Sequence, residues 1–170
     1  MKLFRYREFI KESFNLKDEE LEDHLDNQEG FNSREDAKEY LDSQVQYYKG
    51  LGDEVTLYRI LFISEDDELD ENHLGDHWTP NIDSLLDPNW VNWIKDVNDA
   101  SSEDKIYVIE ATFKTSDIQW DWTIHTNLSF PNEEEIMVDK AKPIDYKVYK
   151  SIEEFKNRYQ LMISQYHNSI

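Results

Sequence analysis

The chain has 170 residues, with 18 basic and 38 acidic side chains and a net charge of −20 at pH 7. A field of this sign repels phosphate backbones, so direct nucleic-acid binding is not expected. No window approaches the roughly 18 apolar residues of a membrane span, and the start shows no secretory signal, so we expect a cytoplasmic protein that does not enter membranes. Cysteine is absent, which excludes disulfides and thiolate chemistry.

The composition still predicts a compact core. Apolar residues make up only 38 % of the chain, but eight Phe, ten Tyr and five Trp are present. Each aromatic side chain buries roughly 150–250 Å², so a core can form from few residues. The length favours one domain over two, because a chain of roughly 150 residues can bury about 70 % of its surface in a single core.

Residues 1–50 form an acidic region that is predicted to be helical. Ser33 is the expected N-cap of its clearest helix. Ala37 and Leu41 follow at helical spacing, and Gly50 is the expected stop.

Residues 51–150 are predicted to be rich in β-structure. An acidic loop is expected at 64–76 and a helix at 82–97, which Pro88 must start or break. The strand candidates are the β-branched and aromatic segments 55–63, 106–113, 117–122, 135–139 and 144–149.

Residues 151–170 close the chain with a helix. Ser151 and Glu154 have the spacing of a capping box, and the following apolar residues keep one helical face. Helices, then a sheet, then a final helix indicate an α+β fold.

Arg59 is the first candidate functional residue, because it lies inside an otherwise apolar strand. A buried guanidinium is costly unless it is paired, so Arg59 must meet either a carboxylate or a bound anion such as a diphosphate. In so acidic a chain a structural ion pair is one reading. An anion-binding role is the other.

Glu133 and Glu135 are the second candidate, two residues apart where a strand begins. With a period of two they should project to the same face of that strand. Two such carboxylates can stabilise the positive charge that develops on a sugar in an oxocarbenium-like transition state. Alternatively, the two glutamates belong to an acidic turn before a strand that only keeps the sheet edge soluble.

Three segments, read in order, resemble the ADP-ribosyltransferase superfamily in its arginine, serine, glutamate-type branch. Leu57-Tyr58-Arg59 is similar to the family's first core strand, and His77-Trp78-Thr79 to its Ser-Thr-Ser motif, with His77 where the first serine is expected. Glu133-Glu134-Glu135-Ile136-Met137-Val138 matches its Glu-x-Glu motif and the aliphatic strand behind it. The resemblance covers roughly residues 55–150 and implies a mostly antiparallel, split β-sheet core.

The resemblance also implies roles for these residues. Arg59 would hold the phosphates or nicotinamide ribose of NAD, and residues 77–79 would shape the nicotinamide pocket. Glu135 would bind the ribose 2′-hydroxyl as nicotinamide departs. Glu133 would orient or deprotonate an acceptor, in this family an arginine, and the loop 120–132 would lie where the target is recognised.

Other sites rank lower. The acidic segment 65–71 lacks the spacing and central glycine of a calcium loop. His73 and His77 lie four residues apart, but Gly75 separates them and no third zinc ligand is apparent. We therefore expect no metal site.

Two further functions remain open. The charge of −20 exceeds what solubility needs, which favours an acidic interaction protein, in the manner of a DNA mimic, that binds a basic partner. Alternatively, the transferase fold is kept as a binding module in which His77 blocks the nicotinamide site.

Overall fold

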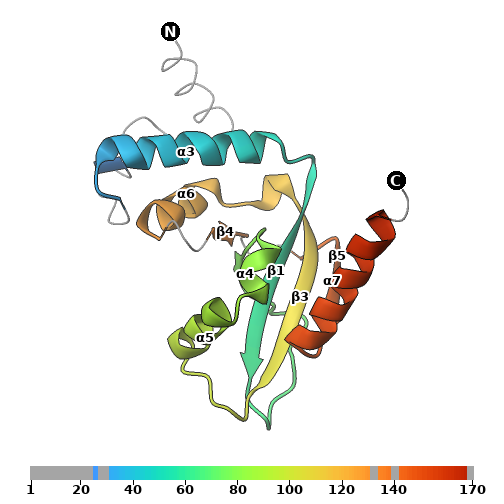
Figure 1. The fold of residues 1–170 in the computed structure, drawn as a ribbon. Helices are drawn as coiled ribbons and strands as arrows, with labels where there is room; N and C mark the ends of the chain where they lie inside the picture. The colour runs from blue at the N-terminus through green and yellow to red at the C-terminus, as the bar shows by residue number, and fades with distance from the viewer. Residues whose placement is uncertain (1–24, 27–30, 131–133, 139–141, 168–170) are drawn as a thin grey trace. The chain divides into compact units, whose positions relative to one another are not determined.

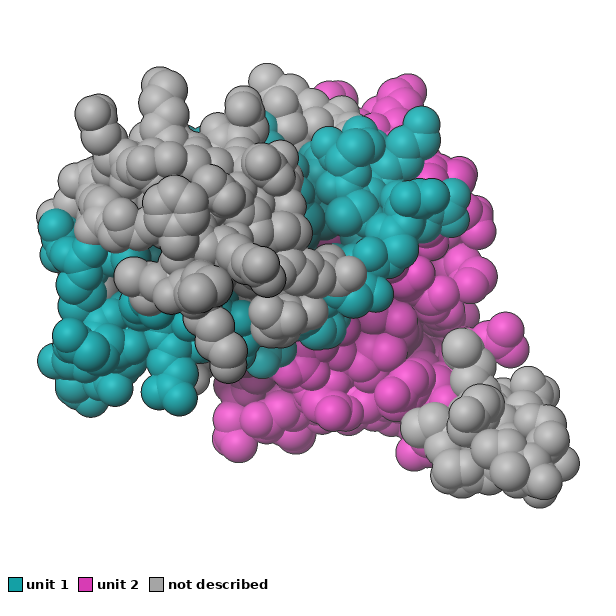
Figure 2. Space-filling model, turned by 90° about the horizontal axis from the view of Figure 1, so that it is seen from above, with its two compact units in different colours: residues 1–55, 114–141 teal, residues 56–113, 142–170 magenta. Residues whose placement is uncertain are grey.

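The computed structural model describes residues 25–26, 31–130, 134–138 and 142–167. They form an α+β fold that ends in a helix. By its contacts the chain divides into two compact units, residues 1–55 with 114–141 and residues 56–113 with 142–170 (Figure 2). The prediction of helical structure before residue 25 lies outside the described residues.

In the part of unit 1 that the structure describes, two helices contact each other, and the second of them also contacts a short strand. The first helix ends at Lys49, as Gly50 predicts, and Ser33 is confirmed as its N-cap, because the Ser33 hydroxyl accepts a hydrogen bond from the Asp36 amide at 3.1 Å. Ala37 and Leu41 are buried on this helix. The elements are α3 (Arg34–Lys49), α6 (Trp120–Ser129) and β4 (Ile136–Met137).

Helix α6 corrects a prediction. The segment 117–122 is not a strand: residues 115–117 form a 3-10 turn, Ile118 makes one antiparallel bridge to Val138, and α6 begins at Trp120. The helix buries Ile124 and Leu128, which are four residues apart, and this burial outweighs the aromatic composition on which the strand prediction rested.

The main sheet of unit 2 has the strand order β1-β3-β5 (Figure 1). Strands β3 and β5 are antiparallel, with Glu110 opposite Lys147. Between β1 and β3 the Thr56 and Thr112 hydroxyls lie 3.4 Å apart, at the start of one strand and near the end of the other. The bounds are β1 (Glu54–Ile63), β3 (Lys105–Lys114) and β5 (Asp145–Tyr149), all three confirming predicted strands.

The two faces of this sheet carry different residues. One face packs against three helices: α4 (Ile82–Leu86), α5 (Pro88–Val97) and α7 (Ile152–His167). Arg59 belongs to the other face, since side chains alternate along a strand. That face also holds four fully buried side chains: Leu57, Ile109, Ala111 and Phe113.

The helix boundaries of unit 2 follow local signals in the sequence. Pro88 occupies the first turn of α5, and the Asp87 carboxylate caps the Asn89 amide at 2.9 Å, so proline both ends one helix and starts the next. The predicted capping box is formed in a variant: Ser151 caps the helix, and Glu154 reaches back to the residue before Ser151. The Ser151 hydroxyl accepts from the Glu154 amide at 3.0 Å, and the Glu154 carboxylate accepts from the Lys150 amide at 2.7 Å.

Among the residues that the structure describes, no helix has the length and apolar character needed to cross a membrane.

Candidate functional site

Arg59 and the segment 77–79 lie next to each other in unit 2. Tyr58 and Thr79 form an antiparallel bridge, with backbone N···O distances of 2.8 and 2.9 Å. This bridge sets the short strand β2 (His77–Trp78) beside β1. The two motifs are eighteen or more residues apart in the sequence, and the fold joins them.

The Arg59 guanidinium contacts the backbone at the start of β2 and at Gly75, two residues before it. Its Nη1 donates to the His77 carbonyl oxygen at 2.7 Å. Gly75 has φ +85°, and a Cβ built on it would lie 2.6 Å from Arg59 Cζ. One partner of this cation in the structure is thus a main-chain carbonyl, in addition to the carboxylate or anion expected from the sequence.

Trp78 and Thr79 are buried beside this contact, whereas His77 is exposed. The Trp78 indole nitrogen donates to the Gly75 carbonyl at 3.0 Å, and its ring meets Phe113 edge-on at 4.9 Å. The Thr79 hydroxyl accepts from the Asn81 amide at 3.1 Å. Trp78 therefore holds the turn on which the guanidinium lies.

Gly75→Ala tests this packing. We expect a loss of at least about 1–2 kcal/mol in the free energy of unfolding, because a side chain at this φ is strained and its Cβ overlaps the guanidinium. In an Arg59→Ala background the overlap disappears, so the loss should shrink. Urea unfolding of the two single variants and the double variant measures both effects.

Gly52→Ala is the matched control for that experiment. A Cβ at Gly52 meets nothing within 4 Å, so we expect an unchanged or slightly higher stability. Equal losses for Gly75→Ala in the two backgrounds would show that the guanidinium does not pack there.

Glu135 lies in unit 1, directly before β4. Its backbone is bound by the side chain of Asn127: the amide N–H of Glu135 donates to Asn127 Oδ1 at 2.8 Å, and its carbonyl accepts from Asn127 Nδ2 at 2.6 Å. The Glu135 residue is half-buried. Sequence reasoning missed Asn127, although Thr123 and Asn127 have the i, i+4 spacing of one helical face.

The predicted pairing of Glu133 with Glu135 lies only partly within the described residues. Glu133 lies outside the described residues. Glu134 has φ +47°, a left-handed conformation, and Glu135 precedes the strand, so the period-two argument for a shared face does not apply here. Burial and, as the smaller cause, the negative charge of Glu134 raise the pKa of Tyr40 to about 12. The Glu134 carboxylate therefore lies near α3, which carries Tyr40.

The segment 120–132 is also corrected. It is a helix as far as Ser129 rather than a loop, and its last two residues lie outside the described part of the chain. Trp122 is 56 % exposed and meets the His125 ring edge-on at 6.2 Å, whereas Trp120 is half-buried. Trp122 is therefore the more exposed of the two tryptophans.

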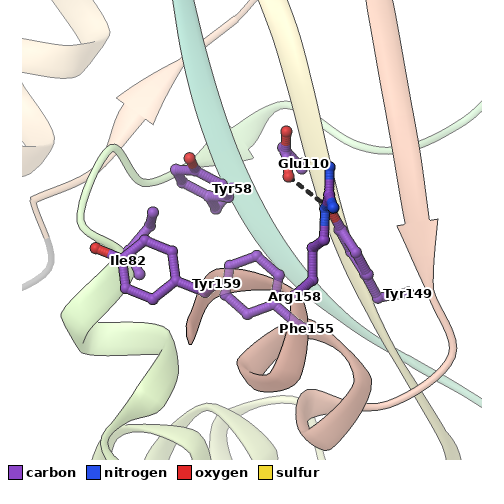
Figure 3. A pocket seen from close by; sticks show the side chains of 7 residues that line it. All are labelled: Tyr58, Ile82, Glu110, Tyr149, Phe155, Arg158 and Tyr159. Carbon is purple, nitrogen blue, oxygen red and sulfur yellow. Dashed lines mark hydrogen bonds between the residues drawn. The ribbon is translucent and has the colours of Figure 1, made fainter. Parts of the chain in front are cut away.

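A second polar cluster lies beneath α7 in unit 2. Glu110 Oε1 accepts from Lys147 Nζ at 2.8 Å, and Oε2 accepts from the Tyr149 hydroxyl at 2.7 Å. The adjoining hollow has an empty volume of about 250 Å³, open solvent included, which is below the roughly 300–1,000 Å³ of sites for small molecules. Figure 3 shows Glu110 and Tyr58 reaching it from the sheet and Arg158 from α7. The hollow is too small for a dinucleotide, and we assign the cluster to stability.

The Glu110 cluster predicts an acid-dependent stability. Burial alone would raise the pKa of Glu110, but hydrogen bonds from Lys147 and Tyr149 and the nearby positive charges lower it below its usual 4.5. A depressed pKa stabilises the fold above pH 4.5, and the contribution disappears as the pH falls through the lower folded-state value. The urea midpoint of Glu110→Gln should therefore lie below wild type at pH 7 and approach it near pH 3.

Glu68→Gln removes an exposed carboxylate and serves as the control. A Glu110→Gln deficit that is the same at both pH values would contradict the assignment of an ionised, hydrogen-bonded Glu110.

The lower-ranked candidates are the acidic segment 65–71 and the pair His73 and His77. His73 Nδ1 lies 2.6 Å from the Asp70 carboxylate, and both side chains are exposed. Within the described residues no group of three or more His, Cys, Asp or Glu side chains is arranged to hold a metal ion.

Comparison with known proteins gives no relative from which a function could be transferred. No protein-family model, no curated protein and no solved structure matches this chain.

Proposed function

We propose that the protein is a mono-ADP-ribosyltransferase-like enzyme that transfers ADP-ribose from NAD to a protein side chain. The acceptor that we propose is arginine. The observation that carries the proposal is the contact of Arg59 Nη1 with the His77 carbonyl. It joins the two motifs of the resemblance that should together hold NAD, and it fixes a half-buried cation suited to a diphosphate.

The proposed reaction assigns one role to each residue. Arg59 binds an anionic group of NAD, and Trp78 and Thr79 support that strand from within the core. The bond between ribose C1′ and the nicotinamide nitrogen breaks, and its electron pair leaves with nicotinamide. Glu135 stabilises the positive charge that develops on the ribose. The acceptor nitrogen bonds to C1′ and loses a proton, which Glu133 is proposed to take.

Two measurements on the full chain test the proposal. The first incubates the protein with NAD labelled in its adenylate phosphate, together with an arginine-rich peptide and, separately, a lysine-rich peptide of equal charge. The second titrates NAD into the protein by calorimetry. Label on the arginine peptide supports transfer to arginine. Absence of both label and binding heat overturns the proposal, and heat without label in either peptide overturns transfer and leaves an NAD-binding module.

The second candidate is an acidic protein that binds a basic partner without chemistry. It is favoured by the acidic segment after β1, in which residues 64–68 and 70–73 are all exposed. This candidate requires that both peptides bind, that their Kd rises steeply with added salt, and that neither is labelled.

A further inference from the structure

Asn127 is a buried polar residue whose hydrogen bonds are directed at one short segment. Asn127 lies on α6 and is 2 % exposed. The amide group uses its oxygen for the Glu135 N–H and its nitrogen for two carbonyls, those of Glu135 at 2.6 Å and Thr123 at 2.9 Å. A side-chain amide has the same donor and acceptor as a peptide group, so Asn127 pairs with Glu135 as a neighbouring strand would.

The residues after Glu135 are fixed by further contacts in the same unit. The Met137 amide donates to the Thr123 hydroxyl at 3.0 Å, and the Met137 carbonyl accepts from the Gln119 amide at 2.8 Å. Val138 forms an antiparallel bridge with Ile118. Backbone N–H and C=O groups of the segment 135–138 are therefore both held by hydrogen bonds. The bonds to Glu135 itself come from Asn127.

We propose that Asn127 is a positioning residue for Glu135: its carboxamide fixes the backbone of Glu135 so that the carboxylate leaves the chain at one place and in one direction. The inference rests on the proposed function, in which that carboxylate meets the ribose. Packing alone does not call for asparagine at a site this buried, because an apolar side chain of similar size would avoid the cost of burying an amide.

The direction of the carboxylate matters more than its presence. A displacement of about 1 Å at a reacting group can cost roughly 100-fold in rate. Glu134, directly before it, has φ +47°, a conformation that costs a non-glycine residue energy and that must be held by the surrounding contacts. Without Asn127 the peptide between Glu134 and Glu135 loses its partner and can relax out of this conformation.

The test compares Asn127→Ala and Asn127→Ser with Thr126→Ala in the full chain. Thr126 is the adjacent residue of the same helix, and its side chain makes no hydrogen bond to any other described residue. Two readouts are needed. Amide hydrogen exchange at Glu135, followed by NMR without NAD, reports the contact. The kcat and KM for label transfer report the reaction.

For both Asn127 variants we expect at least tenfold faster exchange at Glu135 and a kcat lower by about 10–100-fold, with KM for NAD within about threefold of wild type. Thr126→Ala should match wild type in both readouts. The serine variant keeps a polar group at the site and guards against a folding failure of the alanine variant, which circular dichroism will detect.

The outcomes separate the two proposals. Faster exchange with unchanged kcat overturns the positioning role, as does unchanged exchange. An inactive wild-type protein overturns the proposed function alone, because the exchange rates still report whether Asn127 holds Glu135.

Discussion

Glu135→Gln should lower label transfer from NAD by about 10²–10³-fold while the fold stays intact. The substitution keeps the size and shape of the side chain and removes its charge. A neutral amide cannot stabilise the positive charge that develops on the ribose, and loss of one such electrostatic interaction at a reacting centre costs about this much in rate. The ground state of NAD carries no such charge on the ribose carbon. The loss should therefore appear in kcat, with the calorimetric Kd for NAD changed little.

Glu134→Gln provides the control, because it makes the same change of charge one residue earlier. The Glu134 carboxylate acts on Tyr40 and Tyr47, whose pKa values it raises as a cause second to burial. Its neutralisation should change transfer less than about threefold. Equal losses in the two variants would mean that the rate responds to the overall negative field, and the catalytic assignment of Glu135 would fail.

The parts of the fold that were predictable from sequence rest on local signals. Strand β1 is a run of β-branched and aromatic residues, Pro88 can only begin or end a helix, and Ser151 with Glu154 has the spacing of a capping box. Each signal depends on neighbours within a few residues. Local physical chemistry is therefore sufficient to place these elements.

The parts that were missed depend on contacts distant along the chain. In α6 the residues Thr123 and Asn127 are poor helix formers. The helix is stabilised instead by burial of Ile124 and Leu128 and by hydrogen bonds to residues 135–137. No spacing rule predicts that a side-chain amide will replace a strand partner eight residues away. The left-handed φ of Glu134 is hidden for the same reason, since the surrounding contacts impose it.

Phe155 carries the largest expected effect on stability. It is 2 % exposed, and its ring lies among three tyrosines, edge-on to Tyr58 at 5.8 Å and to Tyr149 at 5.2 Å and stacked on Tyr159 at 6.4 Å. Two of these tyrosines belong to the sheet and one to α7, so this one side chain joins the final helix to the strands. Phe155→Ala removes the ring and leaves a cavity, for which about 3–5 kcal/mol in the free energy of unfolding is expected.

The size of the loss in stability of Phe155→Ala depends on whether the surrounding rings can move into the cavity. Tyr149 is held by its hydrogen bond to Glu110 and cannot turn into the cavity without breaking it, so the site should collapse only in part. Phe130→Ala is the matched control: it makes the same substitution at a side chain that is 57 % exposed, where a change within about 1 kcal/mol is expected. Urea unfolding followed by tryptophan fluorescence measures both, with an osmolyte added if Phe155→Ala is unfolded in buffer. Similar losses in the two variants would mean that α7 is not packed through Phe155, and the sheet would then need another cover for the face that carries Tyr58, Val108 and Tyr149.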